Sequence, residues 1–137
     1  MTVEEKLGQL NCLVAPRGAV TGEQQSTGVA EKVRSGAVGS LFGRHDRDEL
    51  MAWQKMAVEE SRLGIPLLFG ADIIHGYRTT FPVPLALAAT WNPESMERAA
   101  RISTVEASSD GLTWLYNPMV DVCRDARWGR CVEGAGE

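Results

Sequence analysis

The sequence predicts an α/β fold in which about three parallel strands alternate with helices. Two apolar runs, Gly36–Phe42 and Ile65–Phe69, are long enough for buried strands and too short for helices. A third run, Trp114–Asp121, follows a segment that is typical of a helix. The order strand, helix, strand, helix, strand favours a parallel sheet with right-handed crossovers.

The N-terminal segment predicts a helix that starts with a capping box, in which Thr2 is the N-cap and Glu5 the third helical residue. We expect this helix to contain Cys12 as a buried thiol and to end in the turn-rich segment Pro16–Gly22. Three apolar residues share one face of it: Val3, Leu7 and Leu10.

Two helices are predicted on either side of the first strand. Gln25–Ser35 forms a short helix with Gly36 as its C-terminal cap. Asp46 caps the next helix, which Gly64–Pro66 ends. The apolar stripe of this second helix consists of Leu50, Trp53, Met56 and Ala57.

The segment Thr79–Thr90 contains Pro82 and Pro84, so we expect an irregular loop there. Asn92–Glu94 is a strong helix start, with an N-cap, a proline in the first turn and an acidic residue after it. This helix ends near Asp110–Gly111. Its inward residues are Met96, Ala99 and Ile102.

Composition excludes several classes of function. The net charge of −4 gives no electrostatic reason to expect nucleic acid or an anionic membrane as partner. No apolar run approaches the roughly 20 residues of a membrane span. The first residues, Met1–Lys6, have neither the basic nor the apolar region of a signal peptide. Three cysteines do not fix the compartment, which stays unknown.

Titratable residues follow two of the predicted strands. Asp72 and His75 come after the strand at Ile65–Phe69, and Asp121 ends the third apolar run. Two carboxylates at one edge of a parallel sheet are typical of acid–base or nucleophilic work on a glycoside. The alternative is structural, with Asp72 capping a turn and Asp121 pairing with an arginine. The residues alone leave both interpretations open.

The segment Arg124–Arg130 places three guanidinium groups and the indole of Trp128 within seven positions. Such groups can bind sugar hydroxyls and stack on sugar rings, or they can form a loop of internal ion pairs. His75 has no second ligand at metal-binding spacing, so a structural hydrogen-bonding role is the better interpretation. No serine elbow, phosphate loop or dinucleotide motif is present.

Four stretches of the chain form long motifs: Phe69–Pro82, Asn117–Arg130, Glu133–Glu137 and the opening Met1–Leu10. They resemble motifs of glycoside hydrolase family 3, in its branch of bacterial periplasmic β-glucosidases and glucan exohydrolases. The resemblance covers the whole chain in the family's order. It implies part of a (β/α)8 barrel and hydrolysis of terminal β-D-glucosyl residues with retention, through a glycosyl–aspartate intermediate. Neither cofactor nor metal is implied.

The resemblance also implies roles for single residues. Asp72 corresponds to the aspartate that binds the hydroxyls of the terminal sugar, and Arg130 to the arginine that holds the same sugar. Asp121 becomes a supporting residue that orients arginines, and the other supporting candidates are His75, Arg124 and Trp128. The nucleophile and the acid correspond to positions after Glu137, so no catalytic residue is expected within the 137 residues.

A complete barrel needs roughly 250 residues. We therefore expect residues 1–137 to be the N-terminal portion of the family's first domain, inactive on its own, in a β-glucosidase that acts on glucosides or oligosaccharides. The alternatives are a non-catalytic sugar-binding remnant and a β-xylosidase of the same family. A branch of the family that acts on N-acetylglucosamine has Asp-Gln-Glu-Gly-Gly at the place of Asp72–Gly76 in this chain. Because this chain lacks that motif, the resemblance favours glucose or xylose as the terminal sugar. The oligomeric state is open, and full-length relatives are often periplasmic or secreted.

Cys123 and Cys131 flank the arginine-rich loop, as cysteines do in the glucan exohydrolase branch. The resemblance therefore implies a disulfide between them in an oxidising compartment, and their spacing allows one. The alternative is three reduced cysteines in a cytoplasmic protein.

Overall fold

The computed structural model describes residues 1–14, 26–43 and 46–136. The chain divides into two compact units. The first consists of Met1–Ala71 and Asp110–Trp114, and the second of Asp72–Ser109 and Leu115–Glu137. The predicted turns at Pro16–Gly22 and the predicted helix start at Gln25 lie outside the described residues.

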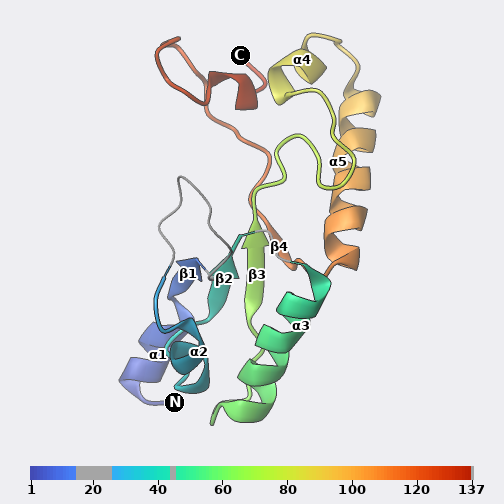
Figure 1. Ribbon diagram of the computed structural model, residues 1–137. Coiled ribbons are helices and arrows are strands. Elements are labelled where there is room, and N and C mark those ends of the chain that lie inside the picture. Colours follow the sequence, from blue (N-terminus) through green and yellow to red (C-terminus); the bar gives the residue numbers. More distant parts are fainter. Residues whose placement is uncertain (15–25, 44–45, 137) are drawn as a thin grey trace. The chain divides into compact units, whose positions relative to one another are not determined.

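A four-stranded sheet of order β1-β2-β3-β4 organises the first unit within the described residues (Figure 1). Its strands are β1 (Cys12–Val14), β2 (Ser40–Phe42), β3 (Leu68–Ala71) and β4 (Trp114–Leu115). The first three are parallel, and Leu41 of β2 lies opposite Leu13 on one side and Phe69 on the other. The predicted parallel α/β fold is confirmed, with one strand more than expected.

The additional strand is β1, and the prediction of a buried Cys12 in a helix was wrong. Helix α1 spans only Val3–Gln9, and Cys12 begins β1 with an exposed side chain. Asn11 ends the helical path because both its backbone and its side chain bind the segment before β2. Its carbonyl accepts the N–H of Gly39 at 3.1 Å, and its Nδ2 donates to the Ala37 carbonyl at 3.0 Å. Pairing with β2 then continues the chain as a strand.

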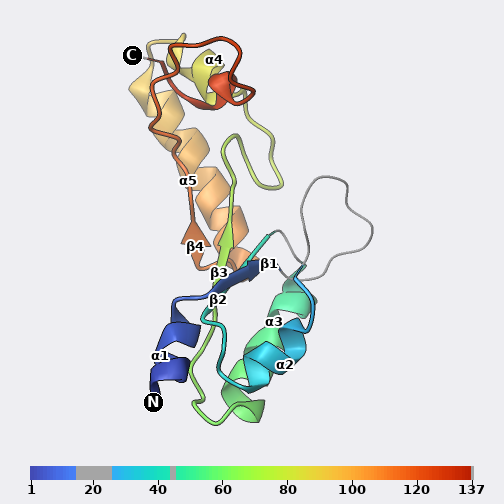
Figure 2. The same ribbon diagram turned by 90° about the vertical axis from the view of Figure 1, so that its left-hand side faces the viewer.

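The helices of the first unit follow their sequence signals. α1 begins with the predicted capping box at Thr2, and α3 (Arg47–Lys55) begins at the predicted N-cap Asp46, which forms a second capping box with Glu49. α2 (Val29–Arg34) lies within its predicted range. A π-helical turn, η1 (Met56–Glu60), continues α3 and packs against α2, which lies beside α3 in Figure 2. The core of this unit is made by buried side chains, among them Val29, Leu41, Leu50, Ala57 and Phe69.

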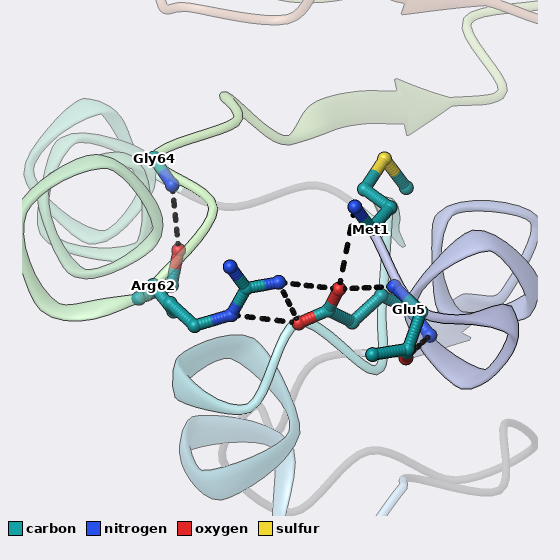
Figure 3. Close-up of polar contacts among 6 residues, drawn as sticks. Met1, Glu5, Arg62 and Gly64 are labelled. Atoms are coloured by element: carbon teal, nitrogen blue, oxygen red, sulfur yellow. Dashed lines mark hydrogen bonds and ion pairs between the residues drawn. The ribbon is translucent and has the colours of Figure 1, made fainter.

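Two glycines let α1 approach the segment that precedes β2. A Cβ on Gly8 would lie 2.3 Å from the Gly36 carbonyl oxygen, and one on Gly39 would lie 2.1 Å from the Gln9 carbonyl oxygen. At the start of the helix, the Arg62 guanidinium binds the Glu5 carboxylate, with the Met1 amino group 4.0 Å away (Figure 3). Hydrogen bonds from Arg62 hold the pKa of Glu5 below its usual range.

The predicted apolar face of α1 is exposed in this structure. Its three residues Val3, Leu7 and Leu10 are 66%, 62% and 82% exposed, and Gly8 is the buried residue of the helix. Contact between α1 and the segment before β2 therefore depends on backbone proximity at the glycines.

The strand before Asp72 is shifted along the chain from its predicted range of Ile65–Phe69. The side chain of Gln54 accepts the N–H of Leu67 at 2.8 Å and donates to its carbonyl at 3.4 Å. Both backbone groups of Leu67 are thus bound to a side chain, and the β3 ladder begins one residue later.

The second unit contains α4 (Pro84–Ala88), α5 (Pro93–Ser109) and a short 3-10 helix, η2 (Cys131–Glu133). The prediction of an irregular loop over Thr79–Thr90 was wrong for its second half. Pro84 stands in the first turn of α4, where a missing N–H costs no hydrogen bond. In both views α4 lies at the N-terminal end of α5, and it contacts α5 and η2 (Figures 1 and 2).

Helix α5 confirms the predicted start and end. The Asn92 side chain accepts the N–H of Ser95 at 3.0 Å, and the helix ends at Ser109, just before Asp110. The strand predicted over Trp114–Asp121 is much shorter in the structure, where β4 ends at Leu115. Pro118 has no N–H group to donate to a neighbouring strand, so the ladder cannot continue through it. Among the described residues, no helix has both the length and the apolar character needed to cross a bilayer.

Candidate functional site

All predicted site residues lie in the second unit, and Asp72 is the first of them. It follows β3 directly and is half-buried. The backbone then folds back on itself over residues 73–81, a segment we call the Asp72 hairpin. Gly76 donates to the Ile73 carbonyl at 3.2 Å, and Phe81 donates to the His75 carbonyl at 2.7 Å. An isolated bridge between Gly76 and Thr80 closes the hairpin.

The hairpin depends on glycine at position 76. Gly76 is buried with a φ of 120°, in the left-handed region that side chains disfavour. A Cβ there would lie 2.0 Å from the Thr79 carbonyl oxygen. The close contact with the Thr79 backbone explains why position 76 is a glycine. The turn that Gly76 permits folds the chain back on itself soon after Asp72.

Glu106 of α5 binds the tip of the Asp72 hairpin, a contact that the sequence analysis did not predict. Its carboxylate accepts the backbone N–H groups of Arg78 and Thr79, both at 2.9 Å, and the Thr79 hydroxyl at 2.6 Å. These hydrogen bonds lower the pKa of Glu106, and the one from the Thr79 hydroxyl has the largest effect. No local sequence pattern marks this contact, because Arg78 and Thr79 lie 28 and 27 residues before Glu106.

His75 has an exposed side chain and lines an apolar cavity of about 300 Å³ together with residues of α4 and α5. Its backbone carbonyl closes the hairpin, as described above. Within the residues that the structure describes, no group of three or more His, Cys, Asp or Glu side chains could hold a metal ion.

The arginine-rich loop contains the internal ion pairs that the sequence left as one of two possibilities. Arg127 Nη2 lies 2.6 Å from Asp125 Oδ2, and this guanidinium lowers the pKa of Asp125. Arg130 Nε lies 2.6 Å from Glu133 Oε2, in the helical turn η2. The Arg127 side chain is 90% exposed, whereas that of Arg130 is 48% exposed. Both arginines are exposed, and the Arg130 side chain is the less exposed of the two.

A hollow of about 310 Å³ brings together several of the predicted supporting residues. It is lined by Asp121, Arg124, Cys123, Cys131 and Leu85, among others. Neither Asp72 nor Arg130 lines this hollow. The expectation that Asp72 and Asp121 end neighbouring strands was wrong, since β4 ends at Leu115 and Asp121 is exposed.

The two loop cysteines lie in contact as free thiols, with their Sγ atoms 2.7 Å apart. Cys131 Sγ also donates to the Trp128 carbonyl at 2.7 Å. The hydrogen bond with Cys123 raises the pKa of the Cys131 thiol. Trp128, 38% exposed, therefore takes part in the loop through its backbone while its indole remains accessible.

Comparison with known proteins gives consistent results. Residues 2–137 match the glycosyl hydrolase family 3 N terminal domain. The chain is 41% identical over its whole length to the periplasmic β-glucosidase of Salmonella typhimurium, of which it covers 17%. It is 31% identical to a putative β-xylosidase of Formosa agariphila, of which it covers 20%. Its structure matches that of a β-glucosidase from Listeria innocua in complex with glucose, with a TM-score of 0.83, 35% identity and coverage of 100% of this chain and 20% of that one.

Proposed function

The chain belongs to glycosyl hydrolase family 3, and we propose that it is the N-terminal portion of the barrel domain of a retaining β-glucosidase. The observation on which this rests is the match over residues 2–137 together with structural agreement over the whole chain. The chain spans about a fifth of the length of the relatives it matches, 17% for one and 20% for two others.

In this proposal the chain supplies sugar-binding groups. Asp72 stands at the carboxyl end of a buried parallel strand, where barrel enzymes place their functional side chains. Its carboxylate accepts hydrogen bonds from hydroxyls of the terminal sugar, and Arg130 donates to the same sugar. Bonds of this kind to charged groups contribute about 1.5–3 kcal/mol each, and those that tighten in the transition state accelerate the reaction.

Supporting residues keep these two groups in place. Glu133 fixes the Arg130 guanidinium, and Asp121 and Arg124 line the neighbouring hollow. The nucleophile and the general acid belong to other parts of the complete protein. Hydrolysis with retention needs two such carboxyl groups about 5–5.5 Å apart.

Glucose is the proposed terminal sugar. Solved structures of the Listeria innocua relative are described with glucose and with laminaribiose, and the Salmonella relative is named a β-glucosidase. The two Formosa agariphila relatives named as β-xylosidases make xylose the second candidate. The Salmonella protein is named periplasmic, so we propose an exported protein.

The test compares the full-length protein with the purified chain of residues 1–137. The full-length protein should hydrolyse nitrophenyl β-glucoside faster than nitrophenyl β-xyloside. NMR should show the β-anomer of glucose as the first product. The chain alone should release no nitrophenol, because it lacks both catalytic groups. A full-length protein without glycosidase activity, or an active chain alone, would contradict the proposal.

A further inference from the structure

One side chain of α5 binds the Asp72 hairpin through three hydrogen bonds. Glu106 places Oε2 against the N–H groups of Arg78 and Thr79 and Oε1 against the Thr79 hydroxyl. Three donors thus converge on one carboxylate, which is half-buried on a helix of 17 residues. Hydrogen bonds to a charged acceptor are about twice as strong as neutral ones.

The hairpin can transmit this restraint to Asp72 because its internal contacts are short and continuous. The residues Glu106 binds, Arg78 and Thr79, form the tip. The Gly76–Thr80 bridge and the Phe81-to-His75 hydrogen bond join the tip to the base. The base follows Asp72 directly, and all these residues belong to one compact unit.

We propose that Glu106 is a positioning residue for sugar binding, which holds the hairpin tip and thereby fixes the orientation of Asp72. This role rests on the proposed function, because it requires Asp72 to bind the sugar. Misplacing a binding group by about 1 Å can cost roughly a hundredfold in rate, so a restraint several residues away can matter. The same carboxylate in a purely structural role would change stability and leave the kinetic constants unchanged.

The experiment uses the full-length enzyme with three variants and a control. Glu106→Ala removes all three hydrogen bonds, Glu106→Gln keeps an amide oxygen for the backbone donors, and Thr79→Val removes only the hydroxyl. Glu97→Ala is the matched control, since Glu97 is an exposed carboxylate on the same helix. Hydrolysis of nitrophenyl β-glucoside and amide hydrogen exchange at Arg78 and Thr79 are measured for each.

We expect Glu106→Ala to lower kcat/KM about tenfold, mainly through KM, and to speed exchange at the two amides about tenfold or more. Glu106→Gln and Thr79→Val should fall between this variant and wild type, and Glu97→Ala should match wild type. If Glu106→Ala showed faster amide exchange but a wild-type kcat/KM in an active enzyme, the positioning role would be overturned and the proposed function would stand. A wild-type enzyme without β-glucosidase activity would overturn the proposed function and this role with it.

Discussion

Asp72 and Arg130 are held by different means, although the same role is proposed for both. Asp72 is positioned by the end of β3, which it follows, and by the hairpin after it. Arg130 is positioned by an ion pair with Glu133, three residues later. Sequence motifs predicted both residues because each motif contains the residue and its local support. Glu106 was missed because its partners, Arg78 and Thr79, are distant in sequence.

At Arg130 we predict that lysine cannot replace arginine. Arg130 Nε is engaged by Glu133, and the remaining guanidinium nitrogens can still donate to a sugar. A lysine ammonium can reach one partner well but does not offer the same fork. Arg130→Lys should therefore lower kcat/KM for nitrophenyl β-glucoside about tenfold in the full-length enzyme. The control is Arg127→Lys, whose 90% exposed side chain pairs with Asp125 and should be dispensable. Equal activity of both variants would contradict the role of Arg130.

At the cysteines we predict a disulfide in protein folded under oxidising conditions. The Sγ atoms of Cys123 and Cys131 already lie in contact, and the bridge would close the loop that contains Arg130. A loop of this size gives about 2–3 kcal/mol of stabilisation in the chain-entropy description. Alkylation followed by mass spectrometry should find both thiols protected until a reductant is added, whereas the exposed Cys12 should react at once. Two freely alkylated loop thiols in the oxidised protein would refute it.

At the scale of the elements, the sequence predicted what is encoded locally. The starts of α1, α3 and α5 depend on residues within one helical turn, and all three were located correctly. β1 and the start of β3 depend on partners elsewhere in the chain. Asn11 pairs with the segment before β2, and Gln54 binds Leu67, so neither boundary could be deduced from local patterns.

The close approach between α1 and the segment before β2 leads to a prediction about the stability of a Gly39 variant. A methyl group at Gly39 would lie 2.1 Å from the Gln9 carbonyl oxygen, and backbone atoms cannot move aside cheaply. Gly39→Ala should therefore destabilise the protein by about 2 kcal/mol or more, seen as a lower Tm. Gly129→Ala is the control, because no atom lies within 4 Å of its Cβ position. A Tm equal to that of the control would show that this contact does not limit packing.

At the scale of the whole molecule, the family was predictable because its motifs are long and occur in order along the entire chain. The match over residues 2–137 confirms that prediction. The surroundings of the sugar could not be predicted in the same way. Local ion pairs engage Arg127 and Arg130 inside the loop, and Asp121 lies in a hollow apart from Asp72. These arrangements result from side-chain contacts that residue spacing does not specify.

We propose that this chain, through Asp72, supplies the carboxylate that binds the terminal glucose of a β-glucosidase. The most direct test is kcat/KM for nitrophenyl β-glucoside in the full-length enzyme and its Asp72→Ala variant, with Tm measured for both. Loss of hydrogen bonds to a charged acceptor, about 1.5–3 kcal/mol each, predicts a decrease of at least roughly tenfold at an unchanged Tm. A variant that keeps wild-type kcat/KM would contradict the claim.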